Sequence, residues 1–170
     1  MNTNFRYIII LLLANLLFLS SEANGQNLSP ASGEINGHQW VDLGLPSGLK
    51  WATCNVGAST PEDPGDYFAY GEVSEKDSYV FNNSINLKKE IRHISGRSEY
   101  DAATVHWGKE WRIPTYHEVD ELVYNCKMEW TTINGKNGYK LTSLINGASI
   151  FLPATGLVDG TQPEFTQECG

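Results

Sequence analysis

Residues 111–126 have the sequence WRIPTYHEVDELVYNC, which predicts the principal helix of the chain. Thr115 is a favourable N-cap, and Glu118 three residues later completes a Thr-x-x-Glu capping box that satisfies main-chain N–H groups of the first helical turn. Apolar residues recur at the i, i+3, i+4 and i+7 positions, which are Val119, Leu122, Val123 and Cys126. We therefore expect a helix over about residues 115–126 with one apolar face packed on a sheet.

Strand and turn signals lie on both sides of this helix. Upstream, residues 40–43 and 49–54 are predicted strands around the turn LPSG at residues 45–48, with proline at the second position and glycine at the fourth. Downstream, residues 130–133 form a predicted strand that runs into a turn at residues 134–138. Both regions indicate antiparallel pairing.

A further hairpin is predicted from residues 139–144 and 149–152, which flank Asn146-Gly147, a pair that tolerates the positive φ angles of a type I′ turn. Residues 67–71 and 79–81 are expected to be short strands. The fold class expected is α+β, with antiparallel hairpins and one principal helix.

Composition and charge narrow the class of protein. Of 170 residues, 41% are hydrophobic and 19% charged, which is typical of a folded globule and not of a disordered or collagenous chain. The formal net charge of −8 and the 12 scattered basic residues disfavour nucleic-acid binding, which needs clustered Lys and Arg.

The N-terminal residues indicate export. A basic Arg6, an apolar run over residues 7–19 and a small-residue exit predict a signal peptide over residues 1–25. Cleavage is expected after Gly25, with Ala23 as the alternative. A 13-residue apolar run is too short for a permanent membrane span, so we expect a secreted or cell-surface protein.

The rest of the chain divides into three parts. Residues 26–37 are polar and are expected to be a flexible leader, residues 38–156 form one domain, and residues 157–170 form a polar tail.

The three cysteines allow three alternative single disulfides in an oxidising compartment. Cys54 and Cys126 both lie in apolar segments, whereas Cys169 is in the polar tail, so we expect a bridge between Cys54 and Cys126. The alternative is that both are small buried thiols.

Five segments in order resemble the Fibrobacter succinogenes major paralogous domain. They are WVDLGLPSGLKWATCNVGA (40–58), GDYFAYGE (65–72), WGKEWRIPT (107–115), NGYK (137–140) and IFLPATG (150–156). The resemblance implies an exported or cell-surface protein, typical of Bacteroidetes, with a fold related to C-type lectin-like domains and to formylglycine-generating enzymes. Such domains usually continue to a further C-terminal strand, so the resemblance also implies that this strand is lacking here.

Residues 111–118 also resemble the Trp-Arg-Leu-Pro-Thr-x-x-Glu stretch of the formylglycine-generating group, where it marks the turn into a helix. We accordingly expect a structural role for Trp111, Arg112, Pro114, Thr115 and Glu118. The cysteine pair on which that enzyme chemistry depends has no match in the C-terminal part of this chain.

No catalytic, cofactor-binding or metal-ligating residue is assigned from the sequence. The four histidines stand singly, without an adjacent Ser or Cys signature: His38, His93, His106 and His117. Two segments carry oxygen ligands of the kind that calcium binds, but both are expected to be solvated loops: Gln162-Pro163-Glu164, and the acidic loop with Glu62, Asp63 and Asp66. The leading hypothesis is an exported, non-catalytic binding or surface module for a glycan or protein. A formylglycine-generating-type enzyme and a structural surface component are the alternatives.

Overall fold

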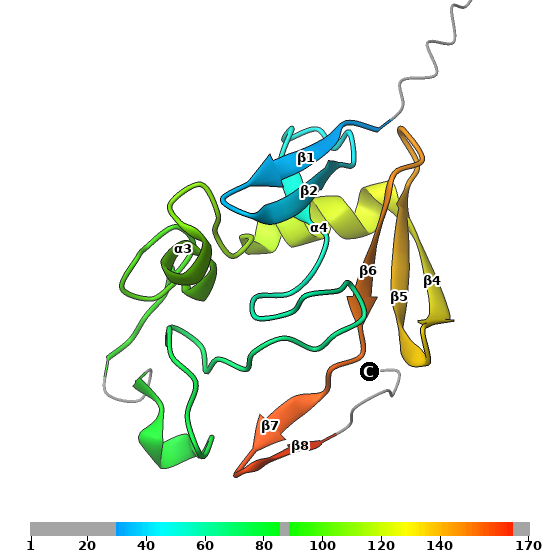
Figure 1. The fold of residues 1–170 in the computed structure, drawn as a ribbon. Coiled ribbons are helices and arrows are strands. Elements are labelled where there is room, and N and C mark those ends of the chain that lie inside the picture. Colours follow the sequence, from blue (N-terminus) through cyan, green and yellow to red (C-terminus); the bar gives the residue numbers. More distant parts are fainter. Residues whose placement is uncertain (1–29, 86–88, 165–170) are drawn as a thin grey trace, which may run out of the picture.

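The computed structural model describes residues 30–85 and 89–164 of the chain (Figure 1). Two three-stranded antiparallel sheets, one two-stranded sheet and short helices make up this part, so the predicted α+β class is confirmed. The expected signal over residues 1–25, the start of the leader and Cys169 lie outside the described residues.

The first sheet has the order β1-β2-β3, with β1 at Ser32–Ile35, β2 at His38–Asp42 and β3 at Lys50–Ala52. The leader predicted over residues 26–37 is therefore wrong from Ser32 onward. A tight turn at Asn36-Gly37, with φ angles of 53° and 81°, folds β1 back onto β2. Asparagine and glycine adopt this left-handed conformation at little steric cost, which favours a two-residue hairpin.

The predicted hairpin around LPSG is confirmed. β2 pairs antiparallel with β3, and Gly48 N donates to Leu45 O over 2.8 Å to close the turn. The second strand is shorter than expected, because it ends at Ala52 and Thr53 to Cys54 continue as a bend.

Two α-helices follow the long middle region. Helix α3 spans Ala102–Trp107 and was not predicted, and helix α4 spans Tyr116–Asn125 with Thr115 as its N-cap and Glu118 in a capping box, as predicted. In Figure 1, α4 runs beneath β1 and β2 and leads directly into β4.

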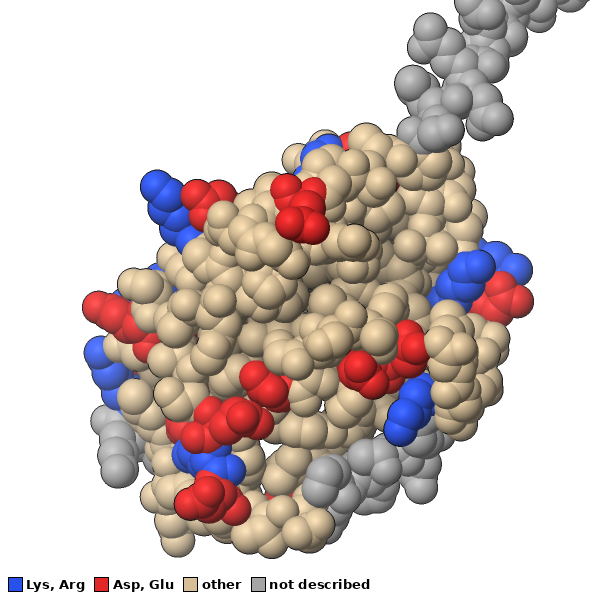
Figure 2. Space-filling view, in the orientation of Figure 1, with Lys and Arg blue, Asp and Glu red and all other residues tan. Residues whose placement is uncertain are grey.

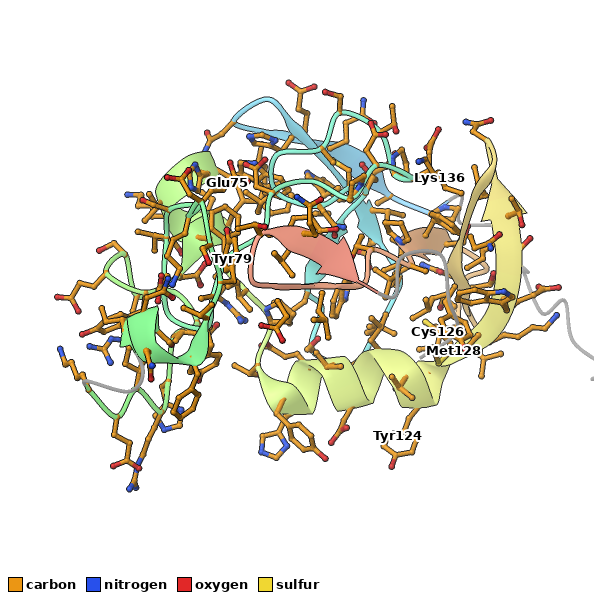
Figure 3. The ribbon with its side chains drawn as sticks, turned by 90° about the horizontal axis from the view of Figure 1, so that it is seen from below. Glu75, Tyr79, Tyr124, Cys126, Met128 and Lys136 are labelled. Carbon is orange, nitrogen blue, oxygen red and sulfur yellow. The ribbon has the colours of Figure 1, made fainter. Side chains whose placement is uncertain are left out.

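Only part of the apolar face expected on α4 is buried. Leu122 is buried, whereas Val119 and Val123 are 40% and 42% exposed. Tyr124 extends away from the body of the molecule, as Figure 3 shows. The buried apolar face of α4 is therefore narrower than the spacing of apolar residues in the sequence suggests.

The second sheet has the order β4-β5-β6, with β4 at Cys126–Ile133, β5 at Lys136–Ser143 and β6 at Ser149–Pro153. Both predicted hairpins are present. The first turn is confined to Asn134-Gly135, with φ angles of 48° and 79°, so residues 136–138 belong to the strand and not to the turn as expected.

The segment expected to be a polar tail is partly a hairpin. β7 at Leu157–Asp159 pairs with β8 at Gln162–Glu164, and Gly160 bridges to Tyr79. Figure 3 shows Tyr79 beside this hairpin. The tail is thus joined to the middle of the chain by main-chain hydrogen bonds.

The middle region does not contain the strands predicted at residues 67–71 and 79–81. Residues 67–69 have no regular structure, and a 3-10 helix, η1, occupies Phe81–Asn83. Tyr67 is instead held by its hydroxyl, which donates to Thr155 O over 2.7 Å.

Two hydrophobic clusters lie on opposite sides of the first sheet. The inner cluster consists of Val41, Leu43, Leu45, Leu122, Cys126, Leu141, Ala148 and Ile150, with Trp51 packed against it. The tryptophan cluster consists of Ala103, Trp107 and Trp111, with Ile35, Trp40, Ala52, Val56 and Ile113 packed against it. Neighbouring strand residues point to opposite faces, so Val41 and Trp51 face one cluster while Trp40 and Ala52 face the other.

Candidate functional site

The connection between α3 and α4 positions the main candidate site. After α3 the chain turns at Gly108, whose φ of 97° suits glycine, and Trp111 N donates to Gly108 O over 3.0 Å. The buried Thr104 hydroxyl donates to Trp111 O over 2.8 Å. These bonds bring the rings of Trp107 and Trp111 to 5.2 Å with an interplanar angle of 77°, an edge-to-face contact.

The buried side chain of Asp101 anchors the connection between α3 and α4. Its side chain is fully buried and accepts main-chain N–H groups from Gly96, Thr104 and Ile113 at 2.6, 3.0 and 2.9 Å. Buried carboxylates need such partners because their desolvation is costly. Asp101 therefore joins the start of α3 to the turn just before it and to the segment that leads into α4.

Arg112 and Glu118 form a two-fold ion pair at the start of α4. Arg112 Nη1 and Nη2 donate to the Glu118 carboxylate over 2.8 and 2.6 Å, and Thr115 N donates to the same carboxylate over 2.7 Å. The hydrogen bonds from Arg112 lower the pKa of Glu118 to about 2, and Glu118 in turn raises the pKa of Arg112. The pair is thus charged at neutral pH and each member neutralises the other.

These elements surround a cavity of about 520 Å³, which we call the tryptophan cleft. Its lining comes from β3, residues 54–56, α3, residues 110–114 and β6. It includes three of the five tryptophans of the chain, Trp51, Trp107 and Trp111. This volume lies within the range of small-molecule and peptide sites in proteins, roughly 300–1,000 Å³.

The charged side chains that line the tryptophan cleft are all engaged with other residues. Lys50 forms an ion pair with Asp42, and the hydrogen bond from Lys50 lowers the pKa of Asp42. Glu110 accepts from Asn36 Nδ2 over 3.1 Å, and Arg112 is bound to Glu118. The cleft therefore presents a mostly apolar surface on which Lys50 and Arg112 are ion-paired, while Glu110 keeps its negative charge beside the neutral Asn36.

One residue that lines the cleft has a buried polar atom without a partner. The indole N–H of Trp51 is buried without a hydrogen-bond partner in the described part of the chain. Such a group is uncommon in native proteins because its desolvation is not repaid.

The predicted disulfide between Cys54 and Cys126 is not formed: both described thiols are free. Cys126 belongs to the inner cluster, whereas Cys54 lines the tryptophan cleft and its thiol donates to Ala58 O over 3.5 Å. The two residues therefore lie in apolar surroundings, as expected, but in two different ones. Burial raises the pKa of the Cys54 thiol, the opposite of the shift that activates a catalytic cysteine.

A second cavity of about 390 Å³ lies between the middle region and β7. Lys76 borders it and is bound within the protein, to Glu72 over 2.9 Å and to the side chain and main chain of Asn83 over 3.0 and 3.3 Å. The Tyr79 hydroxyl donates to Tyr67 O. The polar groups of this cavity thus hold the middle region together, which makes it the weaker candidate site.

The structural residues predicted from the sequence come together at the tryptophan cleft. Trp111, Arg112, Pro114 and Glu118 line it, and Thr115 caps the adjoining helix. Sequence reasoning missed Asp101 and Asn36. Both carried recognisable signals, since Asp101 precedes a short apolar run as an N-cap does and Asn36-Gly37 is the turn pair recognised elsewhere in the chain.

The two segments with oxygen ligands of the calcium-binding kind have structural contacts. Glu62 accepts a hydrogen bond from Asn134 Nδ2, and Gln162-Pro163-Glu164 forms β8. Within residues 30–85 and 89–164, no group of three or more His, Cys, Asp or Glu side chains is placed to hold a metal ion. The face in Figure 2 carries a band of acidic side chains with isolated basic groups between them, in keeping with the net charge of −8.

Across the described residues, no helix has the length and hydropathy needed to cross a membrane. Comparisons with protein-family models, with curated proteins and with solved structures find no match to this chain.

Proposed function

We propose that this chain is an exported, non-catalytic binding module with a C-type lectin-like fold, and that it takes its ligand in the tryptophan cleft. The observation that carries the proposal is the meeting of three tryptophans at one concave surface: Trp51 comes from β3, and Trp107 and Trp111 come from the end of α3 and the connection after it. Large rings supply much contact area at low cost in conformational entropy, and for that reason they dominate binding surfaces.

The state of the ionisable groups supports binding over catalysis at this surface. Arg112 and Glu118 are bound to each other, and the pKa of the Cys54 thiol is raised. An acid, base or nucleophile acts on a substrate when its proton or lone pair is free to do so. In the tryptophan cleft Arg112 and Glu118 are occupied in holding the start of α4, and the Cys54 thiol donates to Ala58 O.

Binding is tested by blocking the cleft. Val56 lines it, whereas Leu144 is 70% exposed and does not. A glycan array and a peptide library are probed with the wild-type chain, with Val56→Trp and with Leu144→Trp. We expect ligands that bind the wild type and Leu144→Trp but bind Val56→Trp at least tenfold more weakly. If Val56→Trp and Leu144→Trp bound the ligands equally well, the binding site would lie outside the tryptophan cleft. If no ligand bound the wild-type chain, the proposal would be overturned.

Export is tested separately by N-terminal sequencing of the protein recovered outside the cytoplasm. The proposal expects a mature chain that begins at Gln26, or at Asn24 if cleavage follows Ala23. Recovery of the chain in the cytoplasm alone, beginning at its first residues, would contradict it.

A further inference from the structure

The edge of β3 that faces away from β2 is open. β3 is the last strand of the first sheet, and in the described part of the chain no main-chain group of Lys50–Ala52 bonds on its outer side. Thr53 N donates to Gln39 O over 3.1 Å, so Thr53 faces β2. Because hydrogen bonding alternates along an antiparallel strand, Trp51 also faces β2, while the N–H and C=O groups of Lys50 and Ala52 point to the open side.

This open edge borders the tryptophan cleft. Consecutive strand residues point their side chains to opposite faces of a sheet, so a cavity over one face touches alternate residues only. Lys50, Trp51 and Ala52 all line the cleft. The cavity therefore runs along the edge of the strand, where the unpaired main-chain groups are.

The opposite wall of the cleft is apolar and incompletely covered. It includes Ile150 and Leu152, two residues apart on one face of β6, which is itself the last strand of the second sheet. Ile150 is buried, but Leu152 is 41% exposed. The cleft is thus lined both by the open edge strand β3 and by an apolar face of β6.

The chemistry of this space favours a peptide backbone over a sugar. Hydroxyl groups of a sugar need several free polar side chains, yet Lys50, Glu110 and Arg112 are engaged within the protein and Asn55 Nδ2 donates to Pro64 O over 3.1 Å. What the cleft leaves unpaired are the outward main-chain groups of Lys50 and Ala52 in the edge strand β3. These groups are suited to the alternating donors and acceptors of an extended chain.

We propose that the tryptophan cleft binds an extended, uncharged peptide segment of another polypeptide, which adds as a strand to the open edge of β3. Its alternate side chains contact Trp107 and Trp111 on one side and Ile150 and Leu152 on the other. The occupant needs no charged side chains, because Lys50 and Arg112 are ion-paired with Asp42 and Glu118. Glu110 keeps its negative charge, since its partner Asn36 is neutral. It is a separate segment and not a folded second copy, because the opening is concave and a folded copy would have to unpair one of its own strands to fill it. This inference rests on the proposed function and names the partner class for the same site.

The test uses the full chain and the pentapeptide acetyl-Thr-Val-Ile-Val-Thr-amide as the probe, with binding followed by tryptophan fluorescence. Two matched control peptides have the same side chains but carry N-methyl groups on alternate residues, one on the odd and the other on the even positions. Each control lacks the N–H donors on one edge of the peptide strand. We expect the control that lacks the donors facing β3 to bind at least tenfold more weakly than the parent peptide. Equal binding of both N-methylated registers and the parent peptide would overturn strand addition while leaving a ligand-binding cleft in place.

Two variants at one position test the edge itself. Ala52→Pro removes the outward N–H and leaves the bonds to β2 unchanged, whereas Ala52→Gly keeps that N–H. We expect Ala52→Gly to bind the pentapeptide within a few-fold of wild type and Ala52→Pro at least tenfold more weakly, with circular dichroism unchanged in both.

Three further outcomes would overturn the inference, and they differ from failure of the proposed function. If the chain bound a glycan at the cleft but no peptide up to millimolar concentration, the peptide inference would be rejected while the proposed binding function would stand. Sedimentation as a dimer that Ala52→Pro abolishes would identify a second copy as the occupant. Full binding by Ala52→Pro would show that the edge of β3 is not used.

Discussion

The inner cluster and the tryptophan cluster are built from similar apolar residues but are closed in different ways. Leu43 and Leu141 of the inner cluster are 0% and 1% exposed, because α4 and two sheets enclose them. The tryptophan cluster opens to the tryptophan cleft, and the polar anchor Asp101 holds its position. The comparison shows that one apolar cluster is enclosed by a helix and two sheets. The other is positioned by hydrogen bonds and borders a cavity, although its rings Trp107 and Trp111 are only 7% and 8% exposed.

The largest expected effect tests the enclosure of the inner cluster. Leu141→Ala should lower the free energy of unfolding by about 4 kcal/mol, since it removes apolar contact and leaves a cavity that the two sheets cannot close. Leu144→Ala is the control, because that side chain is 70% exposed and should change stability by about 0.5 kcal/mol or less. Urea titration measures both. A loss below about 1 kcal/mol for Leu141→Ala would contradict the enclosed cluster.

The next effect tests the anchor of the tryptophan cluster. Asp101→Ala should cost about 3 kcal/mol, because the main-chain N–H groups of Gly96, Thr104 and Ile113 lose their acceptor in a buried place. Asp101→Asn retains one acceptor oxygen and should cost less. Near-ultraviolet circular dichroism should report altered tryptophan packing in Asp101→Ala. Equal stability of the wild type and both variants would show that the anchor is dispensable.

A smaller effect concerns the pH dependence of the ion pair beside the cleft. The folded-state pKa of Glu118, about 2, lies below its ordinary value of 4.5, so the pair stabilises the fold fully above about pH 5. This contribution is lost as the pH falls from about 4.5 toward 2. With allowance for solvent screening, Glu118→Gln should cost on the order of 1 to 2 kcal/mol at pH 7.

The difference between Glu118→Gln and wild type should therefore shrink as the solution is acidified. Urea titrations at pH 7, 4.5 and 3 measure it. The same difference in stability at pH 7 and at pH 3 would show that the Arg112 partnership does not set the acid sensitivity of this region.

The smallest effect concerns the start of α4, which lies between the two clusters. Thr115→Ala should cost about 1 kcal/mol through loss of the threonine half of the capping box. Thr115→Ser preserves the hydroxyl and should be close to wild type. The loss should be the same with and without a ligand in the tryptophan cleft, since the cap acts on the helix alone. Unchanged stability in denaturant titration would place the start of the helix elsewhere.

Elements closed by local hydrogen bonds were predictable from the sequence. The capping box of α4, the LPSG turn and the hairpins around Asn134-Gly135 and Asn146-Gly147 all formed. The type I′ turn expected at Asn146-Gly147 did not, because Gly147 has a positive φ of 75° and Asn146 does not. In each of these the residues that determine the conformation are within a few positions of one another, so their pattern is visible in the printed sequence. The hairpin at Asn36-Gly37 carries the same signal and was missed because its polar surroundings suggested a leader.

Three features depend on tertiary structure alone: the conformation of the middle region, the surroundings of the two described cysteines, and the presence of the tryptophan cleft. Tyr67 is held by Thr155, 88 positions away, and Tyr79 by Gly160, so strands expected from local aromatic content did not form. Cys54 and Cys126 are both in apolar segments of the sequence, but in the structure Cys126 belongs to the inner cluster while Cys54 lines the tryptophan cleft. The sequence by itself determined which short segments bend, pair or coil, because those choices are made by neighbouring residues. Which of their faces enclose a core and which stay open is decided by contacts between residues far apart in the chain, and no local pattern records those contacts.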